Sequence, residues 1–92
     1  MGFADNRGVR IAYEVQGESS TATPLVLVHA FPLHRGMWSA IAEPRAASRR
    51  VVTVDLRGFG ESDIAADGAM DRMATDVRAV VTAESLGRVV VA

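Results

Sequence analysis

Three short, unbroken apolar runs constrain the fold of this 92-residue chain more than any other feature. The runs are Leu25–Val28, Val51–Val54 and residues 89–91, and each has the length and composition of a strand covered on both faces, as in parallel sheets. A segment with helical periodicity separates each run from the next. Strands that alternate with helices over connections of this length predict an α/β fold with parallel strands and right-handed crossovers.

The two helical segments differ in how clearly they are marked. Residues 36–47 form the first, and Pro44 predicts that it kinks or ends early. Its apolar residues at helical spacing are Met37, Trp38, Ile41 and Ala42. Residues 71–86 form the second, with Gly87 as a natural stop. Its expected core stripe comprises Met73, Val77, Val80 and Val81, opposite Arg72, Thr75, Arg78 and Thr82.

The amino-terminal region predicts an edge hairpin. A turn signal, Asn6-Arg7-Gly8, separates a short run that contains Phe3 from residues 9–15, in which apolar and polar residues alternate. Such alternation is typical of a strand with one face against the core and the other in water. Residues 17–24 read as a polar loop that leads to the first apolar run.

Composition and charge narrow the classes of function. Ten basic and eleven acidic residues leave a net charge of -1, so we expect neither nucleic acid nor a membrane as a partner. The chain has no cysteine, which excludes a disulfide or a cysteine nucleophile within it. The first residues lack the pattern of a signal peptide and no apolar run approaches membrane-spanning length, so we expect a cytoplasmic protein. This length allows one domain or part of one.

The chemistry is expected in the loops that follow the strands, because ligands bind beyond the carboxyl ends of strands in open parallel sheets. Residues 29–34, His-Ala-Phe-Pro-Leu-His, follow the first run, and residues 55–63, Asp-Leu-Arg-Gly-Phe-Gly-Glu-Ser-Asp, follow the second. Parallel strands place both loops at the same edge of the sheet. That edge is the candidate site.

These two loops resemble the α/β-hydrolase family, which usually shows a His-Gly-x-Pro loop after one strand and an Asp-x-Arg-Gly-x-Gly-x-Ser turn after the next. The first motif is carried here by His29, Ala30 and Pro32, and the second by Asp55, Arg57, Gly58, Gly60 and Ser62. Trp38, in the helix between the two motifs, also has the position expected from this family. The resemblance covers essentially the whole chain and implies the N-terminal part of an α/β-hydrolase fold. Ala30 departs from it, because the family usually has glycine there.

The resemblance also implies a function and the roles of several residues. The family's next element is a Gly-x-Ser-x-Gly nucleophile elbow, so the serine is expected beyond Ala92, with the acid and the histidine base after it. Residues 1–92 are therefore expected to be a truncated domain that is inactive alone. The backbone N–H of Phe31 would belong to the oxyanion hole, and the side chains of Phe31 and Leu33 would line the acyl pocket. The implied substrate is a small ester, a lactone or a related acyl compound, and no cofactor is implied.

Other roles for the motif residues are less favoured. Ser62 lies outside any Gly-x-Ser-x-Gly sequence, and we expect it to bond local backbone. His29 and His34 lack a carboxylate partner for a metal site, and we expect none. Asp55 lacks the glycine-rich loop that a ribose-binding acid requires, so local hydrogen bonds or an ion pair of Asp55 and Arg57 are expected to hold the turn.

Alternatives to the serine hydrolase stay open. Cofactor-free haloperoxidases and enol-lactone hydrolases share these motifs, and an aspartate nucleophile, as in dehalogenases, is not separated from serine. A second hypothesis is a non-catalytic fragment or interaction module. In that case the last strand would be an exposed apolar edge able to self-associate.

Overall fold

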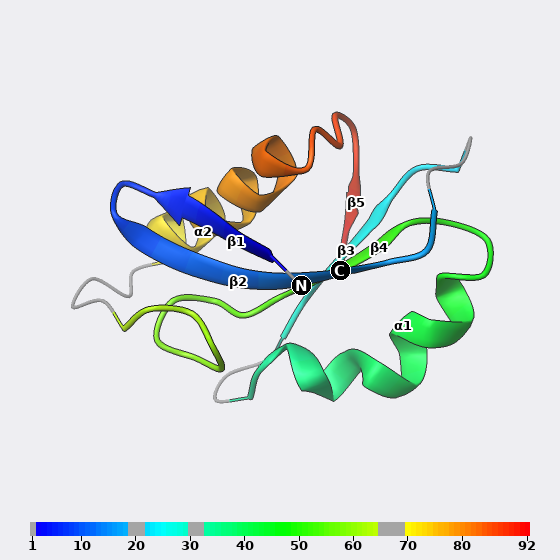
Figure 1. Cartoon of the computed structure of the whole chain (residues 1–92), viewed down its shortest axis with the longest axis horizontal. Helices are drawn as coiled ribbons and strands as arrows, with labels where there is room; N and C mark the ends of the chain where they lie inside the picture. Colours follow the sequence, from blue (N-terminus) through cyan, green and yellow to red (C-terminus); the bar gives the residue numbers. More distant parts are fainter. Residues whose placement is uncertain (1, 19–21, 30–32, 65–69) are drawn as a thin grey trace.

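The computed structural model describes residues 2–18, 22–29, 33–64 and 70–92. Within these ranges the chain forms one five-stranded sheet with the strand order β1-β2-β4-β3-β5 (Figure 1). The strands are β1 (Gly2–Asn6), β2 (Val9–Gln16), β3 (Leu25–Val28), β4 (Val51–Val54) and β5 (Val90–Val91). The helices are a 3₁₀ turn η1 (Arg35–Trp38), α1 (Ser39–Arg45) and α2 (Met70–Ala83).

The three predicted parallel strands are confirmed. β3 pairs in parallel with β4 and with β5, whereas β2 pairs antiparallel with both β1 and β4. The prediction that the third apolar run is buried was wrong. β5 lies at the edge of the sheet, and Val90 and Val91 are 47% and 55% exposed. No described element covers that edge.

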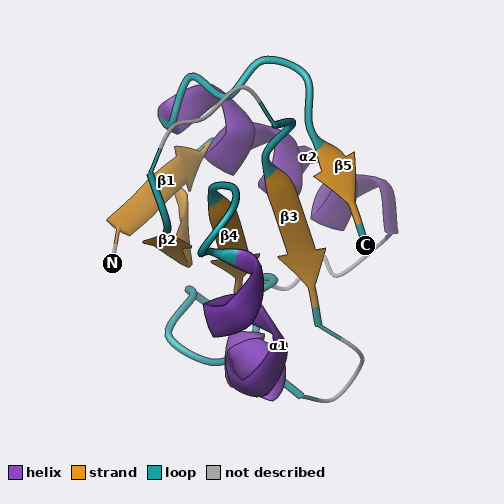
Figure 2. Ribbon diagram, turned by 90° about the vertical axis from the view of Figure 1, so that its right-hand side faces the viewer, coloured by secondary structure: helices purple, strands orange, loops and turns teal. Residues whose placement is uncertain are grey.

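The unbroken apolar runs of β3 and β4 supply two cores, one on each face of the sheet. Val26, Val52 and Val54 pack in the larger core together with Val80 of α2. Alternate positions turn to the other face, where Leu27 and Val51 contact Ala42 of α1. Figures 1 and 2 show α2 and α1 on opposite sides of the sheet. The arrangement is therefore three-layered, as helices on both faces of a parallel sheet require.

The predicted hairpin is present, but its expected wet face is not. Three successive residues of β2, Ile11, Ala12 and Tyr13, are buried, so both faces of the strand are covered there. One cause is the loop after β4, because the N–H of Ala12 donates to Ser62 Oγ at 2.7 Å. The other is position, since β2 lies between β1 and β4. The alternating pattern thus predicted the strand correctly but did not predict that its second face is buried.

For the helix predicted at residues 36–47, the residues expected to face the core were partly wrong. The helix opens with η1, and a 3₁₀ turn has fewer residues per turn than an α-helix. Met37 and Ile41 consequently remain 41% and 46% exposed, while Ala42 is fully buried. The helix ends one residue after Pro44, as the sequence predicted for this segment.

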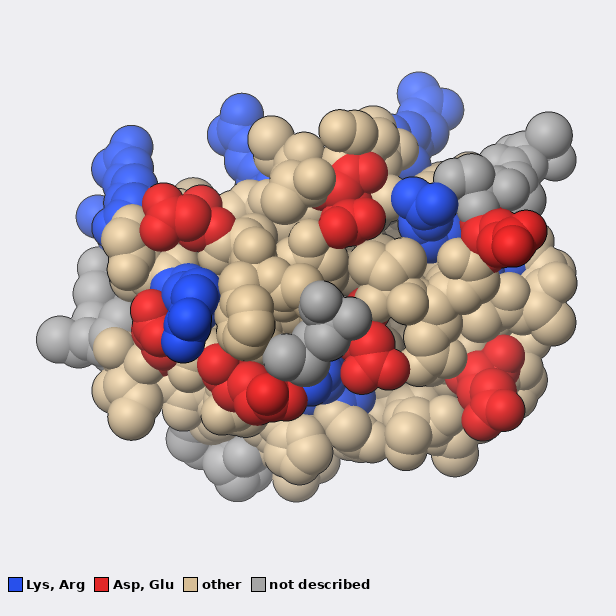
Figure 3. Space-filling view, viewed as in Figure 1, with Lys and Arg blue, Asp and Glu red and all other residues tan. Residues whose placement is uncertain are grey.

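The amphipathic helix was predicted correctly except at its end. Val80 is fully buried, and Val77 and Val81 pack against the same core. The predicted polar positions Arg72, Thr75, Arg78 and Thr82 are exposed. Arginine side chains stand along the edge of the molecule over which α2 and the loop after it run (Figure 3). The helix ends at Ala83, because Ser85 adopts a positive φ of 52° before Gly87 is reached. No described helix is long and apolar enough to cross a bilayer.

Tyr13 ties the hairpin to the end of α2 and offers a test of the fold. Its hydroxyl donates to Glu84 Oε2 at 2.6 Å. Burial first, and then the hydrogen bond and charge of Glu84, raise the pKa of Tyr13 to about 12 from 10.0. An unfolded chain releases this proton at lower pH than the folded chain does. The free energy of unfolding should therefore fall as pH rises from about 10 through about 12.

Absorbance titration of tyrosinate checks this prediction directly, because Tyr13 is the single tyrosine. We expect a midpoint near 12 in the folded chain and near 10.0 in urea. In Glu84→Gln the folded midpoint should move part of the way back, since burial remains. A folded midpoint at the ordinary value, with circular dichroism unchanged, would contradict the contact.

Candidate active site at the carboxyl edge of the sheet

The carboxyl ends of β3, β4 and β5 meet at one edge, which we call the rim. His29 follows β3, Asp55 follows β4 and Ala92 follows β5. The strand ends are held together directly, since the N–H of Val28 donates to the carbonyl of Ala92 at 2.8 Å. The rim is where open parallel sheets bind ligands.

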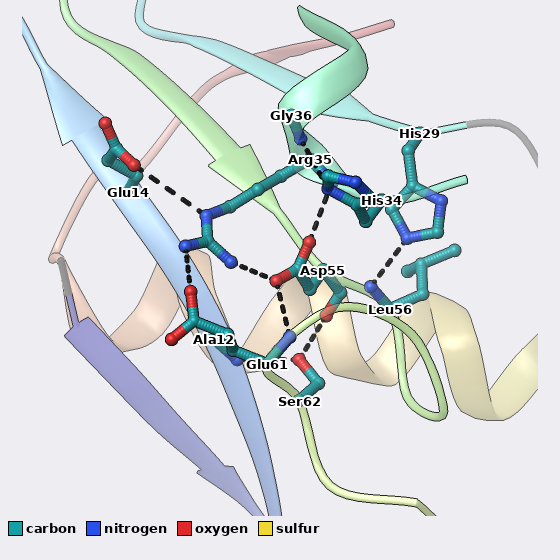
Figure 4. Close-up of polar contacts among 10 residues, drawn as sticks. All are labelled: Ala12, Glu14, His29, His34, Arg35, Gly36, Asp55, Leu56, Glu61 and Ser62. Carbon is teal, nitrogen blue, oxygen red and sulfur yellow. Dashed lines mark hydrogen bonds and ion pairs between the residues drawn. The ribbon is translucent and has the colours of Figure 1, made fainter. Parts of the chain in front are cut away.

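A fully buried carboxylate, that of Asp55, organises the rim (Figure 4). Its Oδ1 accepts the backbone N–H of Arg35 at 2.7 Å, and its Oδ2 accepts the N–H of Glu61 at 3.0 Å. The guanidinium of Arg35 also pairs with Oδ2. Asp55 therefore joins the start of η1 to the turn that follows β4.

Arg35 is held as a cation among three carboxylates. Besides Asp55, its Nη2 lies 2.6 Å from Glu61 Oε1 and its Nε lies 3.8 Å from Glu14 Oε1. Burial lowers the pKa of Arg35, but the hydrogen bonds and charges of Glu61 and Asp55 outweigh this and raise it above its ordinary value. The buried negative charge of Asp55 is thus balanced by a permanent positive charge.

His29 acts as a second tie between the two loops. Its Nε2 accepts the N–H of Leu56 at 3.0 Å, and its ring packs edge-on against Phe59 at 5.3 Å between centroids. The accepting Nε2 assigns the imidazole proton to Nδ1 in the neutral ring. Leu56 therefore contacts His29, and the preceding residue, Asp55, contacts Arg35. In the sequence, His29 and Arg35 stand on either side of residues 30–34.

Ser62 lies in the same turn and is 8% exposed. Its Oγ accepts the N–H of Ala12 and donates to the carbonyl of Asp55. Both interactions are made to backbone atoms. The hydroxyl thus joins β2 to the end of β4.

Arg57 points to the other face of the sheet and forms a buried pair with Asp76 of α2. The Nε–Oδ2 and Nη2–Oδ1 distances are 2.8 and 2.6 Å, and Asp76 is fully buried. Sequence reasoning missed Asp76 and Arg35. The available signal for Asp76 was an acidic residue four positions before Val80, on the apolar side of the helix. The ion pairs of Asp55 and Arg57 are thus made to residues 20 and 19 positions away, alongside the local bond from Glu61.

The remaining predicted site residues fall into two groups. Leu33 is 46% exposed at the start of the described segment after β3, and His34 Nδ1 accepts the N–H of Gly36 at 3.1 Å. Ala30, Phe31 and Pro32 lie outside the described residues, so the oxyanion-hole donor stays a prediction. Within the described ranges, no cluster of three His, Asp or Glu side chains is arranged to hold a metal ion.

The two glycines of the turn give a matched test of how closely the chain wraps Asp55. Gly58 and Gly60 both have positive φ, at 82° and 53°. A Cβ on Gly60 would lie 2.3–2.6 Å from the Asp55 carboxylate, whereas a Cβ on Gly58 would meet nothing within 4 Å. Gly58→Ala should lower the free energy of unfolding by about 1 kcal/mol, for the backbone alone. Gly60→Ala should cost about 2 kcal/mol more, because the carboxylate must move. Equal losses in urea denaturation would mean that the close approach is absent.

Comparison with known proteins places this geometry in a family. The family described as "alpha/beta hydrolase fold" matches residues 23–92. The pimeloyl-[acyl-carrier protein] methyl ester esterase of Aliivibrio salmonicida is 34% identical over 73% of this chain and 24% of its own length. The soluble epoxide hydrolase of a Corynebacterium species is 37% identical over 82% of this chain and 26% of its own length.

Solved structures agree in fold over almost the whole chain. Est816, described as an N-acyl homoserine lactone degrading enzyme, superposes with a TM-score of 0.90 at 35% identity, covering 98% of this chain and 34% of that one. A thermophilic esterase from Thermogutta terrifontis gives 0.84 at 36% identity, over 98% and 34%. This chain spans a quarter to a third of the length of these proteins. Its motifs, its sheet and these matches together show that the chain belongs to the α/β-hydrolase fold family.

Proposed function

We propose that this chain forms the N-terminal part of a hydrolase that cleaves small esters, lactones or related acyl compounds through a serine nucleophile. The observation that carries the proposal is the match to a lactone-degrading enzyme and to an esterase at 35% and 36% identity over 98% of the chain. One of these proteins is described as degrading an acyl lactone and the other as an esterase, so the proposed substrates are esters and lactones.

In the proposed reaction, a serine that follows β5, beyond Ala92, attacks the acyl carbon. A histidine base takes the serine proton and passes it to the leaving alcohol, and water then releases the acid from the acyl-enzyme. The N–H of Phe31 donates to the oxyanion, a contribution worth roughly 3 kcal/mol for one such donor. The side chains of Phe31 and Leu33 line the acyl pocket.

The described residues support this role by position. His29 and Arg35 flank the segment that contains Phe31, and each is tied to the end of β4, as Figure 4 shows for the contacts with Leu56 and Asp55. Such ties limit the freedom of the chain on either side of a donor, which matters because an oxyanion-hole N–H acts by being fixed before the reaction. Ser62 is not the proposed nucleophile, since its hydroxyl is bonded to Ala12 and Asp55.

A chimera tests the proposal. Residues 1–92 replace the matching N-terminal third of Est816, and the chimera is compared with the 92-residue chain alone. We expect the chain alone to hydrolyse p-nitrophenyl acetate no faster than buffer, because the proposed serine, acid and base lie outside it. The chimera should turn over p-nitrophenyl esters and lactones. Replacing its nucleophilic serine with alanine should abolish that turnover.

A chimera that folds cooperatively but shows no turnover, with Ala30 or with Ala30→Gly, would contradict the proposal. A burst of product from the 92-residue chain alone would contradict the assignment of the nucleophile. If the chimera is inactive because Ala30 misplaces the donor, Ala30→Gly should restore turnover. This third outcome separates a local defect from a wrong function.

The exposed edge of β5 favours a second candidate, an interaction module. Val90 and Val91 are 47% and 55% exposed on a strand with an open edge, and such edges pair with other strands. Self-association that grows with concentration in sedimentation velocity, and is lost in Val91→Lys, would support this function for the isolated chain. A monomer at all concentrations would oppose it.

A further inference from the structure

A groove outside the rim opens between the hairpin turn and α2. Its volume is about 640 Å³, within the range of small-molecule sites. The residues that line it come from the β1–β2 hairpin, the loop after β4 and the exposed side of α2. The charged residues among them are Asp5, Arg7, Arg57, Arg72 and Arg78. The groove therefore lies at the β1–β2 side of the sheet, with β5 at the opposite edge.

Arginine dominates the charge of this groove. Four arginines line it against one carboxylate, that of Asp5, among the described lining residues. Arg57 is neutralised by Asp76, but Arg7 and Arg78 form no ion pair with any residue in the described ranges. The molecule as a whole carries a net charge of -1, so the excess of arginine over carboxylate among the described lining residues is not a property of the whole chain.

Side-chain hydrogen bonds join the elements that line the groove. Asn6 Nδ2 donates to Thr75 Oγ1 at 2.9 Å and to Asp76 Oδ1 at 2.7 Å, which fixes the hairpin against α2. Thr75 Oγ1 in turn donates to the carbonyl of Arg72 at 2.7 Å. Since Asp76 also holds Arg57, one buried carboxylate locks three elements around the groove. A ligand would meet a preformed wall.

Arg7 occupies a turn position whose backbone conformation is unfavourable for arginine. Arg7 and Gly8 have φ of 52° and 89°, the two positive values of a type I′ turn. The first of these positions favours asparagine, and an arginine there is strained. The asparagine instead stands one residue earlier, where it clamps α2. Strain of this kind persists at binding sites, where the side chain is needed.

We propose that this groove binds the phosphate group of a small phosphorylated molecule, at a site separate from the rim. Guanidinium groups present paired N–H donors that match phosphate oxygens, and two of the arginines that line the groove, Arg7 of the hairpin turn and Arg78 of α2, come from different elements. Thr82 adds a hydroxyl from α2. Because the groove is concave, a small ligand fits it better than the surface of an acidic protein would.

Titration of the 92-residue chain with inorganic phosphate and pyrophosphate tests the proposal, followed by amide chemical shifts at constant ionic strength. We expect saturable shifts at Arg7, Thr75, Arg78 and Thr82, with pyrophosphate binding more tightly. Arg78→Gln should weaken binding about tenfold, the loss of one charge-assisted interaction. Arg45→Gln is the matched control. It changes the net charge equally but lies on α1, across the sheet, and should leave the affinity unchanged.

Arg7→Asn separates binding from folding, because its two effects have opposite signs. Asparagine suits the positive φ, so the melting temperature should rise while phosphate affinity falls about tenfold. The proposal would be overturned by linear, unsaturable shifts with millimolar phosphate, or by an equal loss of affinity in Arg45→Gln. Binding by an acidic peptide but not by pyrophosphate would overturn it in favour of a protein partner. None of these readouts requires hydrolase activity, so they stand apart from the proposed reaction.

Discussion

The Asp55 carboxylate is the constraint on which the rim depends. A charge buried this completely is tolerated only when it is paired and hydrogen-bonded, and here it has Arg35 and two backbone donors. Those donors belong to the segment after β3 and to the turn after β4, so satisfying one carboxylate brings both into register. Gly60 is required for the same reason, because the backbone passes where a Cβ would touch that carboxylate.

The turn after β4 also joins the two layers of helices. Asp55 faces the side of η1 and α1 through Arg35, while two residues later Arg57 reaches Asp76 on α2. Arg57 and Asp76 are both buried, and Asp55 is fully buried beside an Arg35 side chain that is 13% exposed, so removing either arginine would leave an uncompensated carboxylate in the interior. Among the described residues, the motif in this turn therefore has a structural role. The reacting groups of the proposed mechanism would come from the loop after β3 and from residues beyond Ala92.

Much of the fold could be predicted because it depends on local pattern. The apolar runs of β3 and β4 and the stripe on α2 follow from the residues that must leave water, whatever their partners are. The errors occur where a distant segment decides the outcome. The cover over Ala12 comes from Ser62, fifty positions along the chain, and the exposure of Val91 follows from strand order. Arg35 was missed because an ion pair between distant residues leaves no periodic signal, and Asp76 was missed because its place on the apolar side of the helix does not reveal its partner.

The most direct test of this account is a double-mutant cycle on Arg35→Met and Asp55→Asn, measured by urea denaturation. If the buried pair organises the rim, the two substitutions should couple by about 1.5 kcal/mol or more. The exposed pair Arg10–Asp63, with side chains 60% and 39% exposed, is the control, and its coupling should stay below about 1 kcal/mol. Additivity within about 0.5 kcal/mol for Arg35 and Asp55 would contradict the account.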